Sequence, residues 1–478
     1  MLTWVAFLLR TATLASQSLW RDEVDAIRFS DWPLPQLLTG LFQTGHNGPL
    51  FFLLLRPWRF LTGDSEFALR YPAAVWGTLA VPLGYILARQ LGLSRWVGLV
   101  TGLLLATSPY LIWYGQEAKM YTLLLLLVTL AFIAYLKALN GGGARWWLIF
   151  TVATSLTFYL HILSPLMLLV YVAVAWLCRD RVRQQWRGWL VSLACLTLPY
   201  LPLALWQIPL LLTNFQSGHP FYPLPEQLHL LLQLYSRGLI RFGRLTPLVL
   251  YIFLLLAGLF LTLPTTRSKS ASRRSRYLLA VWVLLPALTV YLISLRVAVF
   301  EDRYLIYIAP AFYLLIVVGL SSIRPYWRGL AALGLGLALM FNLLGIWQQQ
   351  RQPIKADFRA AAHYLLSQPQ PPATIMVQIP YLQYTLNYYY PADYTLLEGL
   401  WTNDGKSEAA VHTEMTALTA GLTDLWLVVS EEAMWDSRGL TRAWLNQHAD
   451  LIEQAHFMRV DLYHYRFNPN LAKPPSAK

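Results

Sequence analysis

Long apolar runs recur along most of this sequence and set the tightest limit on its fold. A helix needs about 20 apolar residues to cross a bilayer, and about eleven runs of that length precede residue 348. Only 13% of the residues are charged, against about a quarter in soluble domains. We therefore predict a polytopic α-helical membrane protein. The predicted spans are residues 1–19, 69–88, 96–115, 120–137, 146–161, 163–178, 188–206, 245–263, 277–295, 304–320 and 328–347.

Two apolar segments are ambiguous. The run over 49–61 is interrupted by Arg56 and Pro57, and proline removes a helix hydrogen bond and clashes with the preceding turn. We therefore expect Pro57 to break any helix there, and the segment to lie at the interface or re-enter the membrane. The first run could be a signal peptide, but it lacks a basic start and contains Arg10, so we expect an uncleaved first span.

The charges predict which loops face the cytoplasm. With the N-terminus inside, five short loops that carry 15 Lys and Arg all face the cytoplasm, as the positive-inside rule requires. Ten of the 11 acids in residues 1–347 then lie on the outer side. The net charge of +13 belongs to this membrane part, because residues 348–478 hold 10 basic and 13 acidic residues. The basic excess thus reflects orientation, and it does not predict nucleic-acid binding.

A second domain follows the last predicted span. Residues 374–380 and 424–430 are apolar, β-branched runs bounded by turn residues, and they predict buried strands. Residues 441–455 show helical spacing. We therefore predict a transmembrane domain over 1–347, with interfacial helices in a first outer loop at 20–68, and an extracytoplasmic α/β domain over 348–478. The predicted location is the plasma (inner) membrane.

An acidic cluster in the first outer loop is the strongest candidate site. If the stretch RDEVDAIRFS is helical, Asp22 and Asp25 are neighbours on one face and Glu23 points elsewhere. Close, half-desolvated carboxylates raise the pKa of at least one of them, which suits a general base that deprotonates an acceptor. The structural alternative is an acidic face of an interfacial helix, with Arg21 as a counter-charge.

Two further outer segments predict contacts to an anion. In GHNGPLFF, Asn47 or Gly48 can cap a helix that begins at Pro49, and its free N–H groups suit a phosphate. His46 beside it could contact the same anion or a metal. In SPYLIWYGQEAKMY, Lys119 is a candidate phosphate ligand, with Glu117 as its partner or as a sugar ligand. The alternatives are an ordinary capped turn and a polar connector.

Two more polar groups are predicted at the same side. In FEDRYLIY, Arg303 can grip a phosphate with its two-pronged guanidinium, unless Glu301 and Asp302 bind it in a purely structural cluster. His161 lies at the outer end of the fifth predicted span, either as a polar cap or as a metal ligand. No cofactor follows with certainty from these residues, and a divalent metal is a candidate through His46 and His161.

The segments LWRDEVDAIRFS, HNGPLFFLLLRPWRFLTGDSEFALRYP and SPYLIWYGQEAKMYTLLLL resemble the GT-C glycosyltransferases of the protein-mannosyltransferase and aminoarabinose-transferase (family 39-like) type. The resemblance is strongest over 18–125 and weaker through FEDRYLIYIAPAF and KADFRAAAHYL. It implies a membrane enzyme that transfers a sugar from a polyprenyl-phosphate-linked donor, on the outer face and with inversion, to an acceptor lipid, glycan or protein.

The resemblance also implies residue roles. The family's catalytic Asp maps onto Asp22, with Glu23 beside it, and a basic residue after the third span maps onto Lys119. The aminoarabinose branch has an acidic residue and a lysine next to a metal site where this chain has His46 and Asn47. This departure puts metal binding there in doubt.

Two other functions are consistent with the composition: a transporter or flippase for lipid-linked saccharides, and a non-catalytic envelope-assembly protein.

Overall fold

A computed structural model describes residues 1–40, 47–212, 219–239, 246–260, 269–321, 323 and 325–467. The chain divides into two compact units. The first unit comprises residues 1–14 and 29–351, and the second comprises residues 15–28 and 352–478. The short segment 15–28, which carries the acidic cluster, is therefore part of the same unit as the C-terminal part of the chain.

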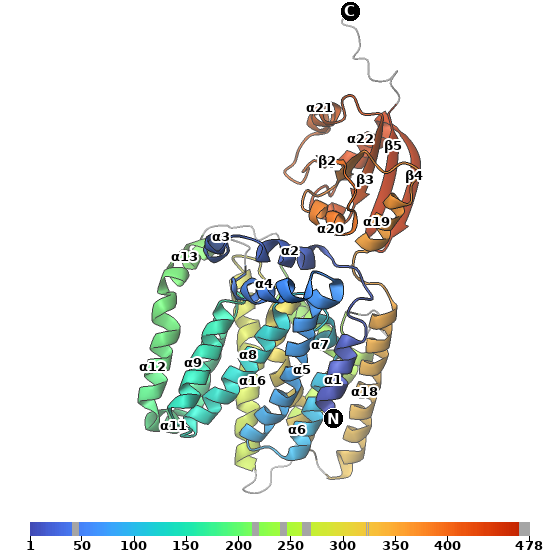
Figure 1. Ribbon diagram of the computed structural model, residues 1–478. Helices are drawn as coiled ribbons and strands as arrows, with labels where there is room; N and C mark the ends of the chain where they lie inside the picture. Colours follow the sequence, from blue (N-terminus) through green and yellow to red (C-terminus); the bar gives the residue numbers. More distant parts are fainter. Residues whose placement is uncertain are drawn as a thin grey trace, which may run out of the picture. The chain divides into compact units, whose positions relative to one another are not determined.

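The first unit is helical throughout its described residues. Long helices such as α5, α8 and α16 run side by side (Figure 1). Its elements are α1 (Leu2–Thr11), α3 (Leu34–Thr39), α4 (Leu50–Thr62), α5 (Glu66–Gln90), α6 (Arg95–Thr107), α7 (Pro109–Tyr114), α8 (Tyr121–Leu139), α9 (Ala144–Phe158), α10 (Leu166–Leu177), α11 (Arg179–Gln184), α12 (Trp186–Thr197), η2 (Leu198–Tyr200), α13 (Leu201–Leu212), α14 (Leu224–Arg237), α15 (Thr246–Phe260), α16 (Lys269–Ser294), η3 (Asp302–Ile308), α17 (Ala309–Ser321), η4 (Pro325–Trp327) and α18 (Arg328–Arg351).

Each of the predicted apolar runs contains a helix in the part of the chain that the structure describes. Six helical segments there are long and apolar enough to cross a membrane, and four more apolar helices are shorter. The first run differs from its prediction, because α1 ends at Thr11 whereas a span over 1–19 was expected. Polar residues explain the early end: the Gln17 side chain accepts hydrogen bonds from the N–H groups of Ile354 and Lys355.

Glycines allow the central helices of the first unit to approach closely. A Cβ at Gly84 of α5 would lie 2.2 Å from a Leu105 methyl of α6, and a Cβ at Gly98 of α6 would lie 2.6 Å from the Tyr85 ring of α5. Small residues serve this purpose at helix contacts in membranes, where packing replaces the hydrophobic driving force. The close α5–α6 pair also contacts α1.

The expectation that Pro57 breaks the helix over 49–61 is wrong. Helix α4 continues from Leu50 to Thr62 with Pro57 inside it, and Figure 1 shows α4 running across the end of the bundle. A mid-helix proline costs about 3 kcal/mol. This cost is offset by packing and by side-chain hydrogen bonds, since Phe51 and Leu55 are buried and the Trp58 indole donates to the Ala68 carbonyl.

The second unit contains a five-stranded sheet with strand order β2-β1-β3-β5-β4. Strands β1, β2 and β3 are parallel, and β5 is antiparallel to both β3 and β4. Its elements are α2 (Arg21–Ser30, whose last two residues belong to the first unit), α19 (Phe358–Leu366), β1 (Thr374–Val377), α20 (Leu382–Tyr389), β2 (Thr395–Glu398), α21 (Glu408–Leu418), β3 (Asp424–Val429), η5 (Glu432–Met434), α22 (Leu440–His448), β4 (Asp450–Phe457) and β5 (Val460–Arg466).

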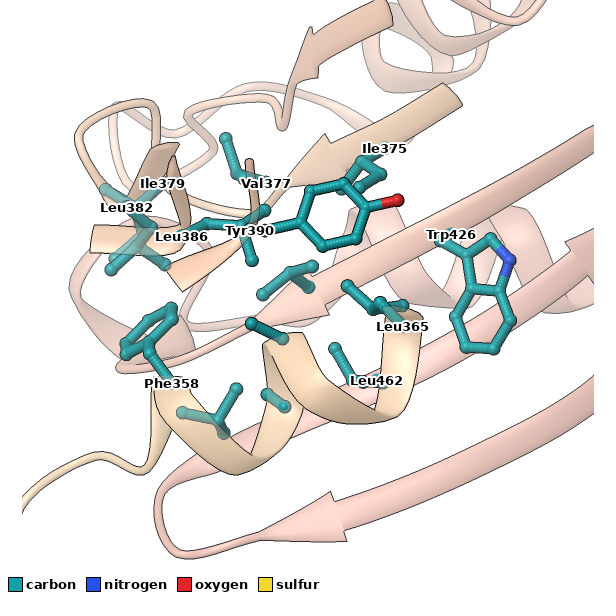
Figure 2. Packing of buried hydrophobic residues seen from close by; sticks show 14 residues of the cluster. Phe358, Leu365, Ile375, Val377, Ile379, Leu382, Leu386, Tyr390, Trp426 and Leu462 are labelled. Carbon is teal, nitrogen blue, oxygen red and sulfur yellow. The ribbon is translucent and has the colours of Figure 1, made fainter. Parts of the chain in front are cut away.

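Apolar side chains fill both faces of this sheet. Figure 2 shows one cluster, in which Phe358 and Leu365 of α19 and Leu386 of α20 pack against Ile375 and Val377 of β1. On the other face, a second cluster joins residues of β1, β3 and β5 to α21 and α22. Neighbouring residues of β1 alternate between the two clusters, as the strand pleat requires. The predicted strands at 374–380 and 424–430 are confirmed as β1 and β3.

The predicted helix over 441–455 is wrong in its second half. Helix α22 ends at His448, and Asp450 begins the edge strand β4, which pairs with β5. Leu451 and Ile452 are about half exposed. Backbone pairing with β5 therefore decides the structure here, and the local side-chain spacing does not.

Candidate active site

The acidic cluster is helical, as predicted. Helix α2 begins at Arg21, and its first turn holds Asp22 and Glu23, where negative charge is stabilised by the helix dipole. Asp22 and Asp25 are both partly exposed, whereas Glu23 is fully buried. The predicted division of the three carboxylates between two sides of the helix is therefore confirmed.

Glu23 forms a buried ion pair within the second unit. Its Oε2 lies 2.9 Å from the Nζ of Lys355, and both side chains are almost inaccessible to solvent. The Trp20 N–H also donates to Oε2 over 3.4 Å. Removing one partner of such a pair strands a charge in a low-dielectric interior, at a cost of about 3–5 kcal/mol. The pair therefore fixes the start of α2 to the segment that precedes α19.

The other two carboxylates each have an arginine partner. Asp22 Oδ1 lies 3.3 Å from an Arg21 guanidinium nitrogen, and Asp25 Oδ1 lies 3.2 Å from Arg28. The Asp22 side chain keeps about a seventh of its surface exposed. A partly exposed carboxylate on a fixed helix end can accept a proton from an incoming hydroxyl, whereas the buried Glu23 carboxylate is already paired.

In the first unit, the connector between α7 and α8 buries both of its predicted site residues. Glu117 is 2% exposed and Lys119 is 9% exposed. Among the residues that the structure describes, the Lys119 Nζ has no hydrogen-bond acceptor or acid within bonding distance. A buried ammonium group is strongly stabilised by an anion, so Lys119 is suited to bind one.

A second connector brings acids and tyrosines to the same region. The Tyr114 hydroxyl donates to Asp302 Oδ2 over 2.8 Å. The Glu117 carboxylate and the Arg303 guanidinium also lie close enough to this hydroxyl to interact with it electrostatically. Glu117, Asp302 and Arg303 therefore share one polar cluster around Tyr114, although they are far apart in the sequence.

The two acids next to Arg303 have other partners as well. Glu301 Oε1 lies 3.2 Å from the Nδ1 of His219, and Asp302 accepts from Tyr114. The alternative prediction, in which Glu301 and Asp302 pair with Arg303 in a structural cluster, thus leaves out these further partners. The cluster is larger than predicted, because it draws residues from the chain segments before α8, before α14 and at the start of η3.

His161 lies in the turn between α9 and α10 and is fully buried. Arg303 lies close to its ring. Its Nδ1 accepts a hydrogen bond from the Leu163 N–H, and its ring packs against Tyr304. His161 therefore belongs to the polar cluster of the first unit.

The GHNGPLFF turn is only partly described. His46 lies outside the described residues, and Asn47 is half-buried. The predicted cap at Asn47 or Gly48 is wrong, because the helix begins at Leu50 and Pro49 occupies the N-cap position without a side-chain cap bond. The Leu50 N–H, which was expected to face an anion, donates instead to the Tyr159 carbonyl. Gly48 is needed there, since a Cβ would lie 2.1 Å from that oxygen.

The described residues do not assemble a metal site. Across the described ranges, no three His, Cys, Asp or Glu side chains lie together in a group that could hold a metal ion. His161 is held by a backbone N–H and an aromatic ring. The metal hypothesis for His46 and His161 therefore gains no support from the described residues, and we route no chemical step through a metal.

Sequence reasoning missed two partners of the site. Lys355 lies in a KADF segment more than 300 residues after Glu23, so no local pattern links them. Tyr114 stands among many aromatic residues, and only its contact with Asp302 distinguishes it. The available signal for Lys355 was that helical spacing turns Glu23 away from Asp22 and Asp25. A carboxylate that is buried requires a counter-charge.

Comparison with known families gives one match. The family model of dolichyl-phosphate-mannose-protein mannosyltransferases matches residues 46–206, which is about a third of the chain. No curated protein sequence matches the chain significantly. The matched region contains α4 to α12, η2 and the start of α13, and it includes the connector with Glu117 and Lys119.

Solved structures resemble the chain over nearly its whole length. ArnT from Cupriavidus metallidurans in the apo state aligns with a TM-score of 0.59 and 14% identity over 99% of this chain and 98% of its own. The same protein bound to undecaprenyl phosphate gives 0.57 and 16% over the same shares. The Archaeoglobus fulgidus oligosaccharyltransferase, tethered with an acceptor peptide, gives 0.51 and 11% over 97% of this chain and 73% of that one.

These comparisons show a multi-pass membrane protein whose fold is similar to that of ArnT, and residues 46–206 match a family of mannosyltransferases, as the sequence resemblance predicted. The alignment with ArnT covers 99% of this chain.

Proposed function

We propose that this protein transfers a sugar from a polyprenyl-phosphate-linked donor to an acceptor on the outer face of the membrane, with inversion at the anomeric carbon. The observation that carries the proposal is the fold, which matches ArnT bound to undecaprenyl phosphate over 99% of this chain. A lipid-phosphate donor stays in the membrane, so the enzyme that uses it needs residues for a phosphate and a base for the acceptor.

In this proposal Asp22 is the general base. The acceptor hydroxyl oxygen forms the new bond to the anomeric carbon, its proton moves to the Asp22 carboxylate, and the bond from the anomeric carbon to the phosphate oxygen breaks. Polyprenyl phosphate leaves with that electron pair. Glu23 supports the step by fixing α2 through Lys355, and Asp25 with Arg28 completes the charged surface of the helix.

The phosphate contacts are assigned to the cations of the first unit. Lys119 is buried without a partner within bonding distance among the described residues, and Arg303 belongs to the cluster with Glu117. Preorganised cations stabilise the charge that develops on a leaving phosphate. Asn47 and, outside the described residues, His46 stay candidate donor contacts.

The proposal includes an orientation in the membrane. Eleven spans with the N-terminus inside place the basic loops in the cytoplasm and Asp22, Glu117, Lys119 and Arg303 on the outer side, with the second unit also outside. The proposed location is the plasma (inner) membrane. The acceptor is a lipid, glycan or protein that reaches this face, and nucleic acid has no role.

The test measures transfer from labelled lipid-linked sugars, extracted from the cells that make this protein, in membranes with each variant. Asp22→Asn should lower the transfer rate by about 10²–10⁴-fold, because the general base is lost. Lys119→Met should raise the donor concentration needed for half-maximal transfer by about tenfold or more. Asp31→Asn is the matched control, since Asp31 is exposed and pairs with Arg59. Undiminished transfer by Asp22→Asn would exclude the assigned role.

A further inference from the structure

The sheet of the second unit reverses its strand order at β1. The chain passes from β1 to β2 on one side and then to β3 on the other side, and all three strands are parallel. In open α/β sheets, ligands bind outside the carboxyl ends of the strands at such a reversal. The loops that follow β1, β2 and β3 therefore mark this edge as a place to search for a ligand.

Each of these three loops contributes an aromatic ring, and the rings contact one another in series. The rings of Tyr381, after β1, and Trp435, after β3, lie 6.3 Å apart. The rings of Trp435 and Trp401, after β2, lie 4.5 Å apart. Trp401 is 47% exposed. We call Tyr381, Trp435 and Trp401 the aromatic row.

Hydrogen bonds hold the row in place. The Trp435 indole donates to the Gly399 carbonyl over 3.1 Å, and the Thr402 hydroxyl donates to Asp436 Oδ1 over 2.5 Å. These bonds tie the loop after β2 to the loop after β3. Trp401 is exposed, and Tyr381 and Trp435 are half-buried. A preorganised surface loses little entropy when it binds a ligand, so the row is suited to bind one.

The aromatic row ends at the candidate base. The Arg21 guanidinium lies 4.7 Å from the centre of the Tyr381 ring and 3.9 Å from Glu431 Oε2. Arg21 is also the partner of Asp22. All of these residues belong to the second unit. The row and the carboxylate proposed to deprotonate the acceptor are therefore joined through one side chain.

The polar groups at this edge suit a neutral, hydroxyl-rich ligand. Glu431 and Glu432 are ion-paired with Arg21 and Arg442, so the edge carries little net charge. Within the described residues, Glu432 Oε1 and the Oε1 of the fully buried Gln378 have no hydrogen-bond partner. Glu431 has a left-handed backbone with φ of 55°, a strained conformation that clusters at functional sites.

We propose that the aromatic row binds the acceptor and that the acceptor is a saccharide, carried by a lipid or free as a glycan. Sugar rings present flat C–H faces that stack on aromatic rings and hydroxyls that need polar partners, which is the combination found here. The inference rests on the proposed function, because it assigns the acceptor side of the same reaction. A peptide acceptor is the competing outcome of the test.

The experiment uses the full-length protein in nanodiscs, labelled lipid-linked sugars as donor, and an extract of the cell envelope as acceptor. Trp401→Ala should raise the acceptor concentration for half-maximal transfer by about tenfold, with little change in the maximal rate or in donor use. Trp401→Tyr should restore most of the affinity. Ile452→Ala, which alters an exposed residue on β4 at the opposite edge of the sheet, should have no effect.

The acceptor extract is tested in three treated forms. Periodate, quenched before the donor is added, cleaves vicinal diols and should abolish acceptor activity, whereas protease should leave it intact. Partition between organic solvent and water then separates a lipid-borne saccharide from a free glycan, and either result supports the proposal. An extract that keeps its acceptor activity after periodate but loses it after protease overturns the proposal. An unchanged acceptor concentration for half-maximal transfer in Trp401→Ala overturns it as well.

The two proposals fail in different ways. Suppose that the wild-type protein transfers sugar and Asp22→Asn does not. An unchanged acceptor concentration for half-maximal transfer in Trp401→Ala then overturns the acceptor site alone. If the wild-type protein transfers no sugar from any lipid-linked donor, the proposed function fails and the acceptor site fails with it.

Discussion

At the scale of single residues, the site separates two neighbouring acids by burial. Asp22 is partly exposed beside Arg21, and Glu23 is buried against Lys355. The sequence placed both acids at one helix start, and helical spacing alone predicted that they face different directions. It could not predict Lys355, because the pairing depends on how a distant segment packs, and no local pattern encodes that contact.

The buried pair leads to a stability prediction. Glu23→Leu and Lys355→Met should each lower the free energy of unfolding by about 3–5 kcal/mol, because each leaves a charge buried without its partner. The double variant should lose less than the sum of the two. Thermal unfolding of the purified protein, followed by near-UV circular dichroism, gives the comparison. Glu414→Gln is the control, since the Glu414 carboxylate that pairs with Lys406 is 45% exposed and a surface pair is worth about 0–1 kcal/mol.

At the scale of elements, helix α1 depends on a charged side chain at its buried face. Arg10 donates to the carbonyls of Leu105 and Ala106 at the end of α6, where helix carbonyls lack intrahelical partners. Gly77 and Gly115 leave room for it, because a Cβ on either would lie within about 3.2 Å of the Arg10 side chain. In the sequence, Arg10 argued only against a signal peptide, and no local pattern predicted its contacts with α6.

Arg10→Met should therefore destabilise the first unit. It leaves the carbonyls of Leu105 and Ala106 without donors in a dry environment, at about 1–3 kcal/mol for each group. The expected result is a lower midpoint of thermal aggregation in detergent and a lower yield. Arg183→Met is the matched control, because Arg183 lies exposed on α11. Equal midpoints for both variants would contradict the role given to Arg10.

Elements were predicted well where one signal dominates and poorly where tertiary contacts decide. Apolar runs identified the helices of the first unit, since burial in a bilayer requires about 20 apolar residues. The strands β1 and β3 were found because both of their faces are buried. The edge strand β4 was predicted as helix. Most of its residues are exposed, so their hydrophobic pattern does not show that the strand pairs with β5. Helix α4 continues through Pro57 because surrounding contacts outweigh the local penalty.

At the scale of the whole molecule, the candidate residues fall in two units. Asp22, Glu23 and the aromatic row belong to the second unit, whereas Glu117, Lys119 and Arg303 belong to the first. The proposed reaction needs both groups on one side of the membrane. The basic loops predict this, because the positive-inside rule assigns a side to each connector in the predicted set of eleven spans.

Accessibility labelling tests this orientation directly. In a background without Cys178 and Cys195, single cysteines replace Ala144, at the start of α9, and Ala409, on α21 of the second unit. A membrane-impermeant maleimide added to intact cells, from which any outer barrier has been removed, should label Ala409→Cys and leave Ala144→Cys unlabelled until the membrane is opened. Both alanines are exposed, so protection there reports the membrane and not burial. Labelling of Ala144→Cys in intact cells, or protection of Ala409→Cys, would place the second unit and Asp22 on the cytoplasmic side. The donor chemistry proposed for the outer face would then be wrong, whatever the fold.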